Sequence, residues 1–215
     1  MQNYTNGSLE FLRDEYEDFM EDCTYALDKA LTSINIMDRY MDRTSYRNPF
    51  ETVEHRIKEF DSVVEKYFRK REEEHYEELQ TIEDIKKHIH DIIGIRITTA
   101  FRDDISRIVE LFRQFPDFII LDEKDYVKNP KSNGYSSFHM HIQVAVFFPE
   151  VGTRLFTIEI QIRSKSMDYW ATIEHSVKYK NTTPDPRATE QFRELADILA
   201  KADNMAIELR DRNKR

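Results

Sequence analysis

The sequence predicts an α+β fold in which one mixed β-sheet of about five strands is flanked by helices. Three observations carry this prediction. Apolar residues recur at helical spacing over the first fifty residues, from Phe11 to Met37. A run at 92–99 is rich in β-branched residues, which favour strands. Two long segments, 137–148 and 154–163, alternate apolar and polar residues, as expected for strands with one buried face.

The order of the elements follows from these patterns and from turn signals. Pro49 ends the first helical stretch, and Thr81 with Asp84 resembles a capping box at the start of a short helix. A second break is expected at 182–186, where prolines cluster. The expected elements are helices at 1–50, 51–73 and 81–88, a strand at 92–99, a helix at 103–115, strands at 118–127, 137–148 and 154–163, and helices at 165–180 and 187–210.

The composition is that of a globular protein. The chain of 215 residues is 40% hydrophobic and 34% charged, and it lacks the apolar run of about 18 residues that a membrane span needs. Cys23 is the single cysteine, which excludes an internal disulfide and gives no evidence for a nucleophile. The first residues show no basic region followed by an apolar stretch, so we expect no secretory signal and a cytoplasmic protein.

The charge is unevenly distributed along the chain. The net charge is −9, from 32 Lys and Arg against 41 Asp and Glu, which gives no general signal for nucleic-acid binding. Residues 10–22 hold seven acidic residues and one Arg, whereas 56–71 hold six basic residues against three acidic ones. A local basic face on an acidic chain either keeps a helix soluble or serves an anionic ligand.

The two alternating strands each predict one apolar face and one unusually polar face. Side chains alternate between the faces of a sheet. The polar face of 137–148 carries His139 and His141, and that of 154–163 carries Glu159, Gln161 and Arg163. A solvated face of an antiparallel sheet is the simplest interpretation, but plain solvated faces favour Lys, Glu and Thr. The mixture of acid, imidazole, amide and guanidinium favours a functional site.

Further residues point to bound phosphates and a metal ion. On the helix expected at 51–73, Lys58, Ser62, Lys66 and Arg69 fall on one face and Arg56 lies off it. Such a cationic stripe suits a polyphosphate, although a surface stripe looks the same. Asp91, at the start of the strand at 92–99, forms with Glu159 a plausible carboxylate pair for Mg²⁺.

The segment 128–139 is rich in residues that suit an anionic ligand with a base. It offers Lys128 and Lys131 in a turn-rich loop, Gly134 for a tight backbone, and Tyr135 as a ring that can stack on a base. A tyrosine at the edge of the core is the alternative for Tyr135.

Together these segments resemble the RelA/SpoT-type alarmone synthetase family, and within it the single-domain small alarmone synthetases. The resemblance spans about 51–180 and consists of five pieces in family order. They are Arg56-Ile-Lys58 with Ser62, Lys66 and Arg69; Asp91-Ile-Ile-Gly-Ile-Arg96; Lys131-Ser-Asn-Gly-Tyr-Ser-Ser-Phe-His139; Ile158-Glu-Ile-Gln-Ile-Arg163; and Met167-Asp-Tyr-Trp-Ala-Thr-Ile-Glu-His175.

The resemblance implies a nucleotidyltransferase-like synthetase domain that acts as a pyrophosphokinase. Such an enzyme moves the β,γ-pyrophosphate of ATP to the ribose 3′-OH of GDP or GTP and gives (p)ppGpp and AMP. It also implies one domain over 1–215, with an N-terminal helical extension at 1–50, a catalytic core at 51–180 and a C-terminal helix at 187–215. Chemistry of this kind needs positioning, Mg²⁺ and positive charge more than a protein nucleophile.

The resemblance also implies a role for each matching residue. Asp91 and Glu159 would hold Mg²⁺, and Glu159 is the candidate base for the 3′-OH. The other implied roles are a donor-phosphate site of Arg56, Lys58, Ser62, Lys66 and Arg69; an acceptor site of Tyr135 on guanine with His139, Lys128 and Lys131 near phosphates; and a cleft lined by Arg96, Gln161 and Arg163.

One departure from the family pattern leaves the acceptor open. Many relatives carry a basic residue where this chain has Ser136. The loss of that cation weakens the expected preference for a given number of 5′-phosphates. The alternative is a toxic relative that pyrophosphorylates the 3′ end of tRNA, which needs a basic surface for tRNA phosphates. The acidic stretch at 10–22 argues against it.

Other functions receive less support. No histidine precedes residue 51, so we expect no alarmone hydrolysis by a metal-dependent phosphohydrolase site, and scattered histidines with one cysteine predict no zinc site. A catalytically dead domain that only binds nucleotides or RNA remains an alternative. The resemblance implies a homo-oligomer, a tetramer in the small synthetases. The helix at 187–210 has an apolar stripe that suits either self-association or packing on its own domain.

Overall fold

The fold is built on one five-stranded mixed sheet, in agreement with the expected α+β class. The structure is a computed structural model and describes residues 6–76, 78–180 and 186–213. The strands follow the spatial order β1-β2-β5-β4-β3, in which β2 and β5 are parallel and every other pair is antiparallel. Their bounds are β1 Thr52–Ile57, β2 Ile93–Thr99, β3 Ile119–Asp125, β4 Phe138–Phe148 and β5 Gly152–Ser164.

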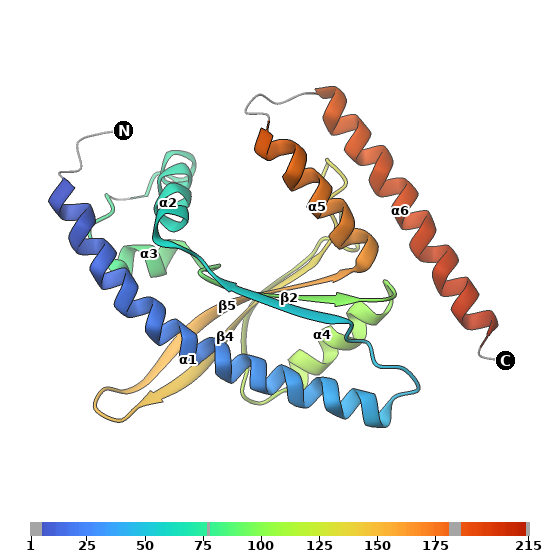
Figure 1. The fold of residues 1–215 in the computed structure, drawn as a ribbon, viewed down its shortest axis with the longest axis horizontal. Helices are drawn as coiled ribbons and strands as arrows, with labels where there is room; N and C mark the ends of the chain where they lie inside the picture. Colours follow the sequence, from blue (N-terminus) through green and yellow to red (C-terminus); the bar gives the residue numbers. More distant parts are fainter. Residues whose placement is uncertain (1–5, 77, 181–185, 214–215) are drawn as a thin grey trace.

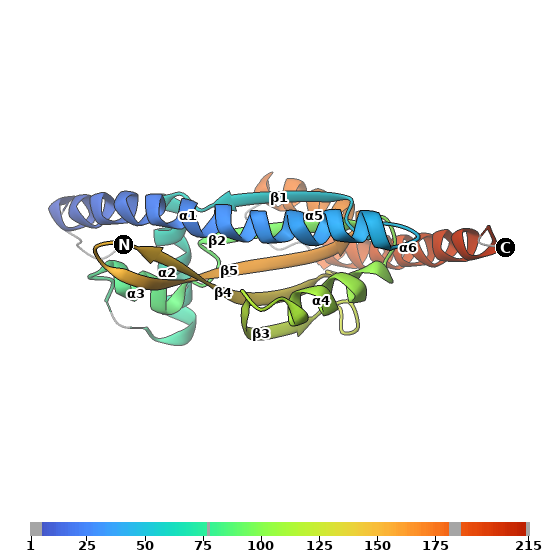
Figure 2. The same cartoon turned by 90° about the horizontal axis from the view of Figure 1, so that it is seen from below.

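Helices lie on both sides of this sheet. In Figure 1, α1 and α4 lie below the sheet, α2 and α5 lie above it, and α6 runs beside α5. Figure 2 shows α1 and α4 in front of the strands, along their length. The bounds are α1 Asn6–Thr44, α2 Phe60–Glu74, α3 Ile82–His88, α4 Asp104–Gln114, α5 Lys165–Lys180 and α6 Pro186–Arg212. Within the described residues, no helix is long and apolar enough to cross a membrane.

The core forms where the apolar face of the sheet meets α1 and α4. Alternate residues of β2, β4 and β5 are buried there, among them Ile95, Met140 and Ile160. The same hydrophobic cluster contains Ile34 of α1 and Phe112 of α4. Burial of these large side chains is the main favourable term in folding. It leaves the opposite, polar face of the sheet open between α2 and α5.

One predicted element is wrong. The helix expected at 51–73 is a strand in its first part, since Thr52–Ile57 forms β1 and the helix begins only at Phe60. Thr52 and Val53 are β-branched, and the edge of β2 offers unpaired backbone groups that β1 satisfies. Arg56 therefore lies on the sheet rather than on a helix. The cationic face of the helix keeps Ser62, Lys66 and Arg69 but not Lys58.

The other predicted elements are confirmed to within a few residues, and so is the capping box. The side chain of Thr81 accepts from the backbone N–H of Asp84, and Asp84 accepts from the N–H of Thr81. The expected break at 182–186 lies almost entirely outside the described residues.

Helix α1 contacts the segment between β1 and α2 through the buried side chain of Tyr16. The Tyr16 side chain is 0% exposed, and its hydroxyl donates to the backbone carbonyl of Lys58 at 2.6 Å. Burial raises the pKa of Tyr16 well above its usual value, so the group stays a neutral donor. The long N-terminal helix thereby fixes the backbone of a residue whose side chain faces the candidate site.

Tyr16→Phe removes this hydrogen bond and leaves the Lys58 carbonyl without its partner. We expect a loss of about 1–2 kcal/mol in the free energy of unfolding, measured by urea denaturation. Tyr40→Phe is the matched control, because Tyr40 lies on the same helix and is 52% exposed. A loss as large in the control as in Tyr16→Phe would contradict this interpretation.

Candidate active site

The candidate site lies on the polar face of the sheet, where two rows of side chains cross the strands. The strand register aligns Arg56, Gly94, Glu159, His141 and Asp122 in one row. The next row contains Glu54, Arg96, Gln161, His139 and Lys124. A cleft of about 220 Å³ lies over the β1, β2 and β5 part of both rows. Gly94 leaves space beside Glu159, and the Arg56 side chain borders that space.

Asp91 is the most tightly held carboxylate of the site. It precedes β2, its side chain is 13% exposed, and Oδ2 accepts from Nζ of Lys58 at 2.6 Å and from Nζ of Lys66. Burial alone would raise the pKa of Asp91, but the two ammonium groups outweigh burial and hold it at about 2. Burial also lowers the pKa of Lys58. Asp91 is therefore ionised at neutral pH.

Glu159, in the middle of β5, is the second buried carboxylate. Its Oε2 accepts from Nε2 of Gln161 at 2.7 Å, and Nδ1 of His139 lies 3.3 Å from Oε1. Burial and the negative charge of Asp91 act to raise the pKa of Glu159, whereas His139 and Gln161 lower it to about 2. Asp91 and Glu159 are thus close enough for their negative charges to repel each other.

The two carboxylates fit a divalent cation. Oδ1 of Asp91 is buried and has no hydrogen-bond partner, so one anionic oxygen in the site is unsatisfied. Hard cations such as Mg²⁺ bind one or two carboxylates and complete their shell with water and phosphate oxygens. Among the described residues, no group of three or more His, Cys, Asp or Glu could hold a metal ion.

The cations predicted for the donor phosphates border this pair. Lys58 and Lys66 contact Asp91 directly, and Arg56 lines the cleft next to Glu159. Ser62 and Arg69 lie exposed on α2, the helix that carries Lys66. Strand β1 and helix α2 thus present these groups from one side of the carboxylates.

A hydrogen-bonded chain links Glu159 to the loop before β4. Nη2 of Arg163 donates to the Tyr135 hydroxyl at 2.8 Å, and that hydroxyl lies 2.7 Å from Nε2 of His139. A carboxylate only accepts, so Glu159 assigns the proton of His139 to Nδ1 and leaves Nε2 to accept from Tyr135. The chain orients His139 toward the carboxylate. It also holds the Tyr135 side chain by its hydroxyl. Burial raises the pKa of Tyr135, although Arg163 acts to lower it.

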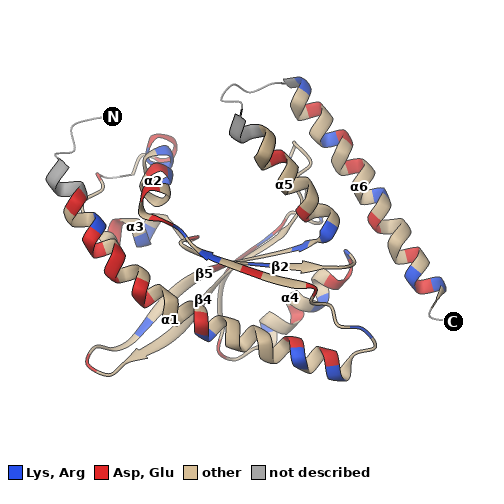
Figure 3. Cartoon of the chain, viewed as in Figure 1, with Lys and Arg blue, Asp and Glu red and all other residues tan. Residues whose placement is uncertain are grey.

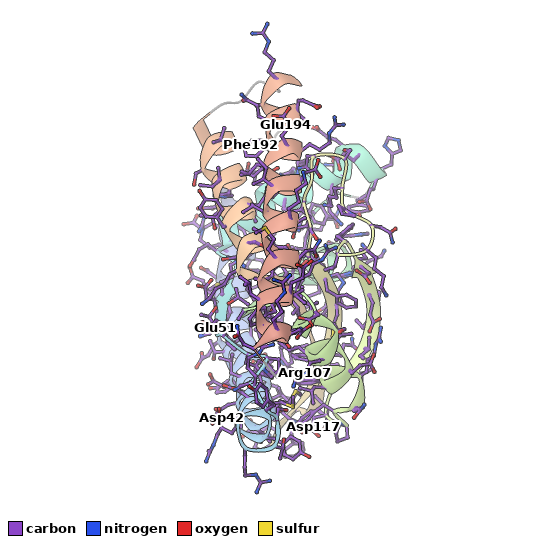
Figure 4. The ribbon with its side chains drawn as sticks, turned by 90° about the vertical axis from the view of Figure 1, so that its right-hand side faces the viewer. Asp42, Glu51, Arg107, Asp117, Phe192 and Glu194 are labelled. Atoms are coloured by element: carbon purple, nitrogen blue, oxygen red, sulfur yellow. The ribbon has the colours of Figure 1, made fainter. Side chains whose placement is uncertain are left out.

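Helices α5 and α6 hold this loop in place. Asn133 donates to Glu174 of α5 at 2.9 Å, and Gly134 has a φ of 92°, which favours glycine. A side chain at position 134 would collide with Ala196 of α6. Nε1 of Trp170 donates to the backbone carbonyl of Phe192, which Figure 4 labels near the start of α6. The match of Glu174 to the family pattern therefore coincides with a structural contact.

The remaining predicted residues divide into two groups. Arg96 and Gln161 line the cleft, and Lys131 lies 4.9 Å and 5.1 Å from the ring centroids of Tyr126 and Tyr135. Lys128 is not brought to the site, since its side chain is 82% exposed and borders a groove with α4 and α6 residues. It pairs with Asp125, the last residue of β3, because the turn that carries Lys128 follows β3 directly.

Sequence reasoning missed Asp168. Its Oδ1 lies 3.3 Å from Nη1 of Arg163 and 3.5 Å from Nη1 of Arg96. Arg163 is only 5% exposed, and a buried guanidinium needs such a partner. The signal was available in the sequence, because Asp168 stands in the first turn of a helix that directly follows the strand of Arg163.

Comparisons with known proteins identify the family of this chain. The family described as a region found in RelA/SpoT proteins matches residues 55–184. The chain belongs to the RelA/SpoT family. Among curated RelA/SpoT relatives from Bacillus subtilis strain 168, GTP pyrophosphokinase YwaC is 35% identical over 85% of this chain and 84% of its own length. GTP pyrophosphokinase YjbM is 33% identical over 84% of this chain and 80% of its own length.

Solved structures of the same RelA/SpoT family share the whole fold, including the terminal helices. Small alarmone synthetase 1 of Bacillus subtilis, bound to its product pppGpp, superposes with a TM-score of 0.82 at 27% identity. The superposition covers 94% of this chain and 99% of the other. Small alarmone synthetase 2 from the same organism gives a TM-score of 0.80 at 32% identity, over 92% and 99% of the two chains.

Asp91→Asn is expected to lower stability in a pH-dependent way. The folded pKa of Asp91, about 2, lies below its ordinary value of 3.8, so the carboxylate stabilises the fold above pH 4–5 and loses this contribution as the pH falls through about 2. Without metal, the variant should be less stable than wild type by about 2 kcal/mol at pH 7. That difference should shrink toward zero near pH 2 in urea denaturation at stepped pH.

Asp14→Asn, at an exposed position on α1, is the control for this experiment and should show no such trend. A difference between wild type and Asp91→Asn that stays constant from pH 7 to pH 2 would contradict the assignment of an ionised, ammonium-bound Asp91.

Proposed function

We propose that this chain is a (p)ppGpp synthetase, which transfers the β,γ-pyrophosphate of ATP to the ribose 3′-OH of GDP or GTP and releases AMP. The observation that carries the proposal is the pair of ionised carboxylates: Glu159 lines a cleft together with Arg56, and Asp91 pairs with Lys58 and Lys66. The two curated relatives are GTP pyrophosphokinases by name, and they match this chain over most of its length. All of the proposed site residues have numbers within the matched range 55–184.

In this proposal, the donor phosphates lie against β1 and α2. Arg56 and Arg69 offer forked guanidinium donors, and Lys58 and Lys66 offer compact ammonium groups for the phosphate oxygens. Ser62 adds a hydroxyl on the same helix. The ammonium groups that hold Asp91 lie between this carboxylate and α2, so they are within reach of a phosphate bound over the cleft.

Asp91 and Glu159 would hold Mg²⁺, whose bound form neutralises charge on the transferred phosphates. The protein groups then need only to position the reactants. Glu159 faces the acceptor 3′-OH and accepts its proton, and His139 with Gln161 keeps the carboxylate oriented for this role. Among the described residues, no Ser, Thr, Cys or Lys lines the cleft, and in-line transfer between two nucleotides requires no protein nucleophile.

The acceptor base is proposed to lie at the loop before β4. Tyr135 supplies a ring, Lys131 a cation beside it, and His139 connects this loop to Glu159. Arg96 and Arg163, held by Asp168, line the floor of the site. Ser136, whose hydroxyl is buried without a partner, adds no positive charge at the position where many relatives are basic. We therefore expect GMP, GDP and GTP to differ little as acceptors.

The tRNA alternative has no support in the comparisons. Binding of tRNA would also require a basic surface, whereas Figure 3 shows acidic residues concentrated along the N-terminal half of α1. This acidic surface would repel the phosphate groups of tRNA. We further propose a cytoplasmic enzyme that self-associates as a tetramer, supported by exposed Ile198, Met205 and Leu209 on α6.

The test is transfer of label from β,γ-labelled ATP with Mg²⁺ to GMP, GDP, GTP or bulk tRNA in separate reactions. We expect label on the guanosine nucleotides and stoichiometric AMP. Asp91→Asn and Glu159→Gln should each reduce turnover by about a hundred- to a thousandfold, with circular dichroism unchanged.

Glu150→Gln is the matched control, because Glu150 lies exposed in the turn between β4 and β5, and it should keep full turnover. Label on tRNA alone would move the protein to the alternative function. Nucleotide binding with no transfer to any acceptor would identify a catalytically dead binding domain.

A further inference from the structure

Two residues of the polar face have no role in the mechanism above, although they lie in the same row as Glu159. His141 of β4 contacts Asp122 of β3, with Nδ1 2.9 Å from Oδ2 and 3.1 Å from Oδ1. The His141 side chain is 13% exposed and the Asp122 side chain 47%. The ring of His90 stands edge-on to that of His141, with 5.9 Å between centroids.

The contact with Asp122 fixes what His141 can offer a ligand. A carboxylate accepts hydrogen bonds, so Nδ1 of His141 carries the proton. In the neutral ring, Nε2 is then an acceptor. Within the described part of the chain, Nε2 of His141 makes no hydrogen bond, and it is not a fully buried atom. On the polar face, Nε2 of His141 is therefore an oriented acceptor that can receive a hydrogen bond from a hydroxyl group of a ligand.

The strand register places this acceptor directly beside the proposed reaction centre. His141 is the cross-strand partner of Glu159, and side chains of such partners stand about 5 Å apart on the same face. On the other side of Glu159, Gly94 has no side chain and Arg56 follows, which is the side of the donor phosphates. His141 thus lies on the acceptor side of the base.

The acceptor nucleotide carries two hydroxyl groups that suit this pair. The 3′-OH must face Glu159, because it gives up its proton there. The 2′-OH is its neighbour on the same face of the ribose. A carboxylate and an imidazole nitrogen side by side offer one acceptor to each hydroxyl of such a cis-diol.

We propose that His141, held by Asp122, accepts a hydrogen bond from the ribose 2′-OH of the acceptor and thereby makes the site select ribonucleotides over 2′-deoxyribonucleotides. This inference rests on the proposed synthetase function. His141 contacts substrate in this role, whereas Asp122 is a positioning residue that acts through the imidazole. A 2′-deoxy acceptor keeps its reactive 3′-OH and leaves Nε2 without a partner.

The experiment compares GDP with 2′-deoxy-GDP as acceptors, with labelled ATP and Mg²⁺, in wild type and variants. Wild type should prefer GDP by about tenfold in kcat/KM, mainly through KM, as expected for one hydrogen bond. His141→Ala should lower kcat/KM for GDP to the value for 2′-deoxy-GDP and leave the latter unchanged.

Two further variants separate positioning from folding. Asp122→Ala, at a half-exposed site, should also reduce the preference for GDP over 2′-deoxy-GDP, because it raises the KM for GDP. Asp122→Asn, whose amide oxygen still accepts from Nδ1, should retain most of it. Gln143→Ala, on the same face of β4, is the control and should keep the wild-type ratio.

Equal use of both acceptors by wild type overturns the inference. An unchanged ratio of kcat/KM for GDP to kcat/KM for 2′-deoxy-GDP in His141→Ala also overturns it, even if both values fall. In both cases transfer to GDP still supports the synthetase. A wild-type protein that transfers no label to any guanosine nucleotide overturns the proposed function, and this inference with it.

Discussion

The site depends on one buried ion-pair cluster, in which Lys58 and Lys66 hold Asp91. A carboxylate that is 13% exposed is costly unless it is paired, and here two ammonium groups from different elements pair with it. Lys58 follows β1 and Lys66 lies on α2, so the cluster fixes both elements against the start of β2. Tyr16 of α1 adds to this by holding the backbone of Lys58. The negative charge of Asp91 therefore holds the end of β1 and helix α2 close to the start of β2.

A second network organises the other half of the site. In this chain Arg163 donates to the Tyr135 hydroxyl, which donates to His139. Nδ1 of His139 then lies 3.3 Å from Oε1 of Glu159. Networks of this kind are rigid when every member is satisfied. Because α5 and α6 pack against the loop that carries Tyr135, helices at the far end of the chain set the geometry of the proposed acceptor site. The two networks meet where Asp91 and Glu159 repel each other.

Much of this arrangement can be predicted from the sequence, for physical reasons. Alternation along β4 and β5 assigns Glu159 and His139 to one face, because the side-chain period of a strand is fixed. The boundary between β1 and α2 cannot be predicted in this way. Residues 51–60 suit a helix as well as a strand, and only the unpaired edge of β2, a tertiary feature, selects the strand. The wrong boundary assigned Arg56 to a helix, whereas Arg56 lies in β1 of the sheet.

Contacts between side chains are similarly hidden from the sequence. Composition places Lys128 and Lys131 in one loop, but the turn after β3 sends Lys128 to the opposite side, toward α4. The position of Asp168 in the first turn of α5 places it near the end of β5, but its pairing with both Arg163 and Arg96 becomes visible only in the structure. The resemblance identified His139 as a partner of phosphates, whereas the structure shows its two ring nitrogens next to Glu159 and Tyr135.

The central claim is that Asp91 and Glu159 share one divalent ion. The most direct test is binding of Mn²⁺, as a spectroscopic substitute for Mg²⁺, measured by electron paramagnetic resonance with a non-hydrolysable ATP analogue present. The account predicts one protein-dependent Mn²⁺ per chain, displaced by Mg²⁺, and weakened at least about tenfold in both Asp91→Asn and Glu159→Gln. Unchanged Mn²⁺ binding in either variant would contradict it.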